Sequence, residues 1–156
     1  MKHSIKNYLA EMVRGLVCLC IGLFSGFTAT VADYQWYDNL NKPFFNPPQW
    51  IFAPIWTVLY IMLGIFAVVL WKKRKTYFKI LCLFIVHLFS NFIWFTLFFH
   101  YHSLTHSLAD IIFIWLSLII IIYFLYKEKT MILLLFPYTL WVTFALLLNG
   151  AIFYLN

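Results

Sequence analysis

Five long apolar stretches constrain the fold of this chain more than any other feature. An α-helix needs about 20 residues to cross the hydrocarbon core of a bilayer, and each stretch is close to that length or exceeds it. None shows the period-two alternation of a membrane β-strand, so helices are the form that satisfies the backbone hydrogen bonds in lipid. The stretches cover residues 15–32, 51–71, 80–99, 108–126 and 131–155.

The composition agrees with this interpretation. Hydrophobic residues make up 65% of the 156 residues and charged residues only 10%, which is far more apolar than an average soluble domain. The sequence therefore predicts an all-α fold, an integral membrane bundle of five transmembrane helices that forms one domain over residues 1–156. With their flanking residues, the predicted helices cover about 8–32, 50–71, 77–99, 106–126 and 130–155.

The basic residues predict the orientation of the bundle, because cytoplasmic loops carry an excess of Lys and Arg. Ten of the eleven Lys and Arg residues lie before the first stretch or around the loops after the second and fourth, which share one side. Lys42 alone lies on the other side. We expect a cytoplasmic N-terminus, an outer C-terminus and a multi-pass protein, in the cell membrane if the source is bacterial. The net charge of +6 then reflects topology, and the lipid bilayer rather than a nucleic acid is the expected partner.

The first stretch has two interpretations. Basic residues precede it and small residues end it, as in a cleaved signal peptide. Its long polar lead, its length and the pair Gly22 and Gly26 favour a retained helix, since this spacing lets two membrane helices approach closely. The pair predicts a helix contact either within the bundle or between two copies of the chain.

Polar side chains within the later stretches predict a binding pocket. His87, Asn91 and Trp94 share one face of the third helix. In the predicted orientation, Trp56, Trp94, Asp110, Trp141 and Ala145 lie in the middle or outer part of the bilayer. They lie below a loop that Pro43, Pro47 and Pro48 stiffen.

Each of these residues also has a structural interpretation. Interfacial aromatic residues anchor helices at the membrane surface, as is expected for Trp36, Trp50, Trp71 and Tyr126. His87 and Asn91 can bond neighbouring helices together, Asp110 can cap a helix N-terminus, and Pro137 can kink a helix. The loop histidines His100, His102 and His106 have loose metal-ligand spacing but are expected to be solvated.

These structural interpretations do not explain the three tryptophans that lie deep in the predicted bilayer. Trp56, Trp94 and Trp141 each bring an indole N–H that needs a partner. A largely apolar, flat-walled pocket with few polar groups suits a large planar aromatic ligand. The sequence shows no metal cluster, nucleophile–base pair or phosphate-binding loop.

Four segments resemble the TspO/MBR family, the tryptophan-rich sensory proteins, translocator proteins or peripheral-type benzodiazepine receptors. They are WYDNLNKPFFNPPQWIFAPIWTVLY at 36–60, NFIWFTLFF at 91–99, LADIIFIW at 108–115 and PYTLWVTFALLLN at 137–149. The resemblance covers nearly the whole chain. It implies a compact five-helix bundle, often a homodimer, that binds porphyrins such as protoporphyrin IX, isoquinoline-carboxamide or benzodiazepine-type drugs and, in some members, sterols.

The resemblance also implies site residues. Trp56 and Trp141 match tryptophans implicated in light- and oxygen-dependent porphyrin breakdown, so the expected chemistry is at most photo-oxidative. No cofactor is required; the porphyrin is the ligand or the substrate, and no metal site is expected. The alternative function is a small transporter or export facilitator for porphyrins or other hydrophobic aromatic molecules. The ligand-binding positions are Tyr37, Pro47, Pro48, Trp56, Asn91, Trp94, Asp110, Trp141 and Ala145.

Some positions depart from the family pattern. The family's proposed sterol motif often has a tyrosine and an arginine where this chain has Leu147 and Tyr154, which argues against sterol recognition through that motif. His87 stands where a glutamine is expected, and Ala53 where a glycine is expected. These differences predict altered ligand selectivity or a changed fit of the loop.

Overall fold

The computed structural model describes residues 34–156, and these residues form helices and no strand. The predicted helix at 8–32 and the pair Gly22 and Gly26 lie outside the described residues. The all-α prediction is confirmed. The elements are α2 (Tyr34–Asn39), η1 (Gln49–Ile51), α3 (Phe52–Lys72), α4 (Phe78–Phe95), the π-helix η2 (Thr96–His100), α5 (Leu104–Phe124) and α6 (Lys129–Leu155).

Four helical segments in the described part are long and apolar enough to cross a membrane. They lie where the last four helices were predicted (50–71, 77–99, 106–126 and 130–155), with ends that differ by at most two residues. Their outward faces are apolar too, because side chains such as Val58, Phe89 and Leu133 are more than half exposed. Helices that are apolar on all sides suit a lipid environment, so the chain is a multi-pass integral membrane protein.

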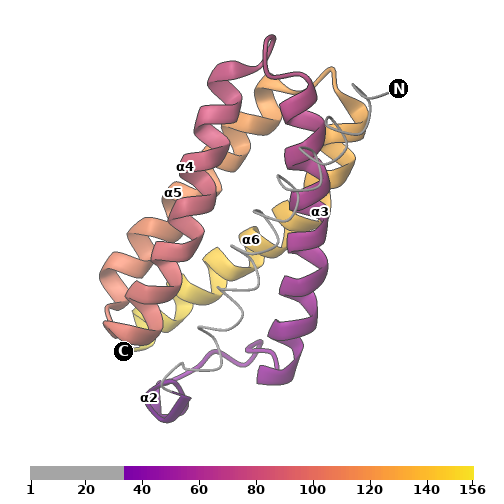
Figure 1. The fold of residues 1–156 in the computed structure, drawn as a ribbon. Helices are drawn as coiled ribbons and strands as arrows, with labels where there is room; N and C mark the ends of the chain where they lie inside the picture. The colour runs from indigo at the N-terminus through magenta and orange to yellow at the C-terminus, as the bar shows by residue number, and fades with distance from the viewer. Residues whose placement is uncertain (1–33) are drawn as a thin grey trace.

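The helices pack in the order α4, α5, α6 and α3 (Figure 1). The long apolar core contains buried side chains from all four, for example Phe66, Phe84, Leu118 and Leu135. The rings of Phe66 and Phe84 meet edge to face at 4.9 Å, which links α3 to α4. Pro137 lies inside α6 without ending it, as membrane helices allow when neighbouring helices satisfy the freed backbone groups.

The short helix α2 covers the end of the bundle at which α6 finishes (Figure 1). Tyr37 is 5% exposed and packs against Phe98 and Phe99 of η2, with ring centroids 6.1 and 5.9 Å away. The backbone N–H of Asn41 donates to Oδ1 of Asn156, and Nδ2 of Asn156 donates to the carbonyl of Asn41, both over 3.0 Å. The segment 40–48, here called the proline loop, is therefore attached to the end of α6.

The opposite end holds seven of the eight Lys and Arg residues in the described range, and Lys42 lies in the proline loop. Glu128 joins the two loops at this basic end by accepting hydrogen bonds from Lys73 Nζ (2.5 Å) and the Tyr77 hydroxyl (3.0 Å). The hydrogen bond from Lys73 lowers the pKa of Glu128, and the bond to Glu128 raises the pKa of Tyr77. The charge asymmetry agrees with the predicted orientation, which stays a prediction.

Candidate functional site

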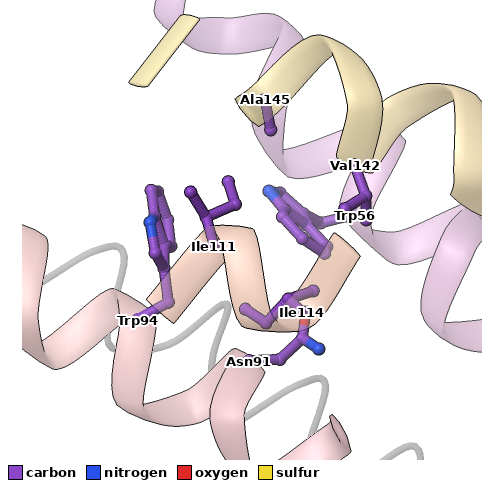
Figure 2. A pocket seen from close by; sticks show the side chains of 7 residues that line it. All are labelled: Trp56, Asn91, Trp94, Ile111, Ile114, Val142 and Ala145. Atoms are coloured by element: carbon purple, nitrogen blue, oxygen red, sulfur yellow. The ribbon is translucent and has the colours of Figure 1, made fainter. Parts of the chain in front are cut away.

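A small cavity lies between α3, α4, α5 and α6. In the view of Figure 2, Trp94 of α4 and Trp56 of α3 flank Ile111, with Ala145 of α6 above them. The cavity has a volume of about 20 Å³, which is room for about one water molecule. Pockets for drug-sized ligands have volumes of about 300–1,000 Å³, so the cavity as it stands is too small for such a ligand. The lining residues are Trp56, Asn91, Trp94, Ile111, Ile114, Val142 and Ala145.

Aromatic rings hold the tryptophans of the cavity in place. Trp56 stacks on Tyr60 at 5.4 Å and meets Trp141 edge-on at 6.4 Å, and Trp94 stacks on Phe98 at 5.3 Å. The buried indole N–H groups of Trp94 and Trp141 have no hydrogen-bond partner in the part of the chain that the structure describes. The site thus has flat apolar walls and two unused donors.

A buried hydrogen-bond network lies beside this cavity and joins α4, α5 and α6. His87 is completely buried; its Nδ1 is 2.8 Å from Ser117 Oγ, and its Nε2 is 2.8 Å from the Tyr138 hydroxyl. The Tyr138 hydroxyl donates to Asn91 Oδ1 over 2.9 Å, and Asn91 Nδ2 donates to the His87 carbonyl over 2.9 Å. The interpretation of His87 and Asn91 as contacts between helices is confirmed.

Each ring nitrogen of His87 faces a hydroxyl that has a second acceptor, the Asn91 Oδ1 for Tyr138 and the Ile114 carbonyl for Ser117. A neutral imidazole carries one proton, so one of these hydroxyls accepts from His87 and the other donates to it. The network leaves one N–H of the Asn91 amide uncommitted at a residue that lines the cavity.

Asp110 lies inside α5 rather than at its end. The N-cap of α5 is Ser103, so the helix-cap interpretation of Asp110 was wrong: the helix begins at Leu104, six residues before Asp110. Ser90 of α4 donates a hydrogen bond to Asp110 Oδ1 over 2.5 Å. The other carboxyl oxygen, Oδ2, is buried and has no partner among the described residues. Asp110 therefore links α4 to α5 with one oxygen and has the other unused.

The structure brings only part of the predicted site together. Trp56, Asn91, Trp94 and Ala145 line the cavity, and Trp141 packs against Trp56. The three loop residues do not line it: Tyr37 packs on η2 and donates to Asn46 Oδ1 over 2.8 Å, and Pro47 and Pro48 lie in the proline loop. Burial raises the pKa of Tyr37. The ligand-binding roles of all nine residues stay predictions.

Sequence reasoning missed the partners of these residues. Tyr138 and Trp115 were not selected, although Tyr138 completes the histidine network and Trp115 donates to Thr143 Oγ1 over 3.0 Å. Trp36 stacks on His102 at 4.3 Å and Trp50 is 73% exposed; the interpretation of both as membrane anchors stays a prediction. Within residues 34–156, no group of His, Cys, Asp or Glu could hold a metal ion.

Comparison with known proteins identifies the family. The model of the TspO/MBR family matches residues 15–155. The tryptophan-rich protein TspO of Archaeoglobus fulgidus is 36% identical, over 96% of this chain and 99% of that protein. The TspO of Chlorobaculum tepidum is 40% identical, over 90% and 95%, and the translocator protein of Bos taurus is 31% identical, over 83% and 80%. This chain therefore belongs to the TspO/MBR family.

Proposed function

We propose that this membrane protein binds tetrapyrroles of the protoporphyrin IX type between α3, α4, α5 and α6, and acts as their sensor, scavenger or regulator. The observation that carries the proposal is the set of indole rings at one apolar cavity, Trp56 and Trp94 at its wall and Trp141 behind Trp56. Stacked or edge-on aromatic pairs contribute about 0.5–1.5 kcal/mol each beyond area burial. Several such contacts with one planar ligand support tight binding.

Binding requires the cavity to open. Its volume of about 20 Å³ is far below what a tetrapyrrole occupies, so Trp56 and Trp94 must move apart. The ligand then replaces the ring contacts that Trp56 now makes with Tyr60 and that Trp94 now makes with Phe98. Isoquinoline-carboxamide and benzodiazepine-type ligands would use the same opening, and we expect them to compete with the porphyrin.

Titration of protoporphyrin IX into the purified protein tests the proposal. We expect saturable quenching of tryptophan fluorescence together with a shift of the porphyrin absorbance. The double variant Trp56→Phe, Trp141→Phe should weaken binding at least about tenfold, the equivalent of about 1.4 kcal/mol. Trp50→Phe is the matched control, because Trp50 is exposed and away from the cavity. Equal affinity of the double variant and this control would remove the two indoles from the site.

A second candidate activity is light- and oxygen-dependent breakdown of the bound porphyrin. The observation that favours it is the direct contact of Trp56 and Trp141 at 6.4 Å, which puts two oxidisable rings beside one cavity. Illumination in the presence of oxygen should bleach the porphyrin faster with the protein than in protein-free detergent, and the double variant should lose the difference. Equal bleaching rates with and without protein would reject this activity.

Transport is the alternative from another functional class. Pro137 lies inside α6, where the missing backbone hydrogen bond eases bending. Pro54 lies in the first turn of α3, where a proline removes no backbone hydrogen bond within the helix. Flux of protoporphyrin IX across sealed vesicles separates the two functions. Saturable binding without protein-dependent flux identifies a sensor or scavenger, and flux that saturates with ligand identifies a transporter.

A further inference from the structure

Asn149 of α6 is buried and yet makes no hydrogen bond. Its side chain belongs to a residue that is 2% exposed, and neither Nδ2 nor Oδ1 has a partner in the described part of the chain. Asn91, the other buried asparagine at the site, is bonded at both ends of its amide. An asparagine that serves only to join helices would be paired in the same way. The unused amide of Asn149 therefore needs another explanation.

The packing of α5 against α6 gives the position of Asn149. Gly150 lies beside Leu108, because a methyl group added to Gly150 would be 4.0 Å from Leu108 Cδ1. Seven residues further along α5 and seven residues back along α6, Trp115 Nε1 donates a hydrogen bond to Thr143 Oγ1. In this antiparallel register, Asn149 is level with residue 109, next to Asp110. It also lies one helical turn beyond Ala145, which lines the cavity.

Other unused polar atoms lie near this level. Asp110 Oδ2 is buried without a partner, whereas its Oδ1 accepts from Ser90. Trp94 lies one turn beyond Ser90 on α4, and its indole N–H is unused among the described residues. We call Asn149, Asp110 and the N–H group of Trp94 the polar layer. It adjoins the apolar cavity on the side of the proline loop.

The polar layer offers donors and acceptors together. Asn149 provides both in one amide, and Trp94 provides a donor, whereas Asp110 adds an acceptor that repels a second anion. A group that both donates and accepts pairs with such an amide at two points. An un-ionised carboxyl group and a carboxamide have this property, and burial away from water favours the un-ionised form of a carboxyl group.

We propose that the polar layer is a subsite that receives an un-ionised carboxyl or carboxamide group of the ligand, with Asn149 as its main contact. This inference rests on the proposed function, because the ring system of the same ligand would fill the apolar cavity. It adds a specificity residue, Asn149, that does not line the closed cavity. It also explains why four buried polar atoms are left unpaired next to an apolar site.

The test compares protoporphyrin IX with its dimethyl ester, which cannot donate from its carboxyl groups. Both are titrated into the wild type and the Asn149→Leu variant, and the ratio of the two affinities is compared between proteins. This comparison cancels the different partitioning of acid and ester into detergent. We expect the preference for the acid to fall about tenfold in Asn149→Leu, the size of one net hydrogen bond. An unchanged ratio overturns the inference.

Thermal unfolding without ligand provides the second measurement. Asn149→Leu should raise the melting temperature because it removes unpaired buried polar atoms, and Asn91→Leu, the matched control, should lower it because Asn91 is paired. If the melting temperature of Asn149→Leu falls as much as that of Asn91→Leu, Asn149 has a structural role and the inference is overturned. If the leucine does not fit, Asn149→Ala tests the same affinity ratio.

The outcomes separate this inference from the proposed function. If the wild type binds neither acid nor ester, both fail. If it binds both and Asn149→Leu weakens both by the same factor, the tetrapyrrole site stands and the carboxyl subsite is rejected.

Discussion

At the scale of single residues, His87 holds the cavity-lining Asn91 in position. Its Nε2 is hydrogen-bonded to the Tyr138 hydroxyl, which in turn donates to Asn91. His87→Leu would remove one hydrogen bond from Tyr138 and one from Ser117, at a net cost of about 0.5–1.5 kcal/mol for each bond. We expect a clearly lower melting temperature in detergent. His87→Gln, the residue expected from the family pattern, can still donate and accept, and should lose less. Equal melting of His87→Leu and wild type would contradict the network.

The sequence predicts the residues of this network but not their partners. The spacing of His87 and Asn91 shows that they share a helix face, because helical periodicity is local. Their bonds to Tyr138 depend on the packing of α4 against α6, which no local pattern encodes. Asp110 was misassigned as a cap because the apolar stretch begins at residue 108, whereas the helix itself begins at Leu104, directly after its N-cap Ser103.

At the scale of elements, Asn156 attaches the proline loop to the end of α6. Asn156→Ala removes both bonds to the Asn41 backbone, so amide exchange over residues 40–48 should rise several-fold by hydrogen-exchange mass spectrometry. Asn156→Asp is the matched control: it can still accept from the Asn41 N–H but cannot donate, and we expect an intermediate rise. Unchanged exchange in Asn156→Ala would show that the loop is held by other contacts.

The helices themselves follow from hydrophobicity, but η2 does not. The third predicted helix covers 77–99 as one regular element, whereas the structure has a π-helix at Thr96–His100. This wider turn belongs to the segment where Phe98 and Phe99 both contact Tyr37. π-turns are frequent at functional sites and have no strong sequence signature. The position of Tyr37 against η2, and not in the cavity, therefore depends on tertiary packing and not on a local sequence pattern.

At the scale of the whole molecule, Glu128 connects the two loops at the basic end through Lys73 and Tyr77. The folded protein lowers the pKa of Glu128. The stabilisation it gives is therefore present above the unfolded pKa and is lost as the pH falls through the lower, folded pKa. Glu128→Gln should lower the melting temperature at pH 7 and make little difference at strongly acid pH. The same difference at both pH values would exclude this linkage.

The assembly and orientation of the molecule stay predictions. Ten of the eleven Lys and Arg residues predict which side is cytoplasmic, and the family resemblance predicts a homodimer. Labelling single cysteines placed at Lys42 and at Lys75, in a background without the native cysteines, gives the orientation. We expect only the first to react with a membrane-impermeant reagent added from outside. Reaction at Lys75 alone would invert the proposed topology.

The central claim is that the tryptophan-lined cavity binds a tetrapyrrole. The most direct measurement is the absorbance spectrum of the protein purified from cells that produce porphyrin. We predict that bound porphyrin co-purifies with the wild type and with the Trp50→Phe control. It should be strongly reduced in the Trp56→Phe, Trp141→Phe variant. Wild-type protein without porphyrin, or equal porphyrin in all three proteins, would contradict the account.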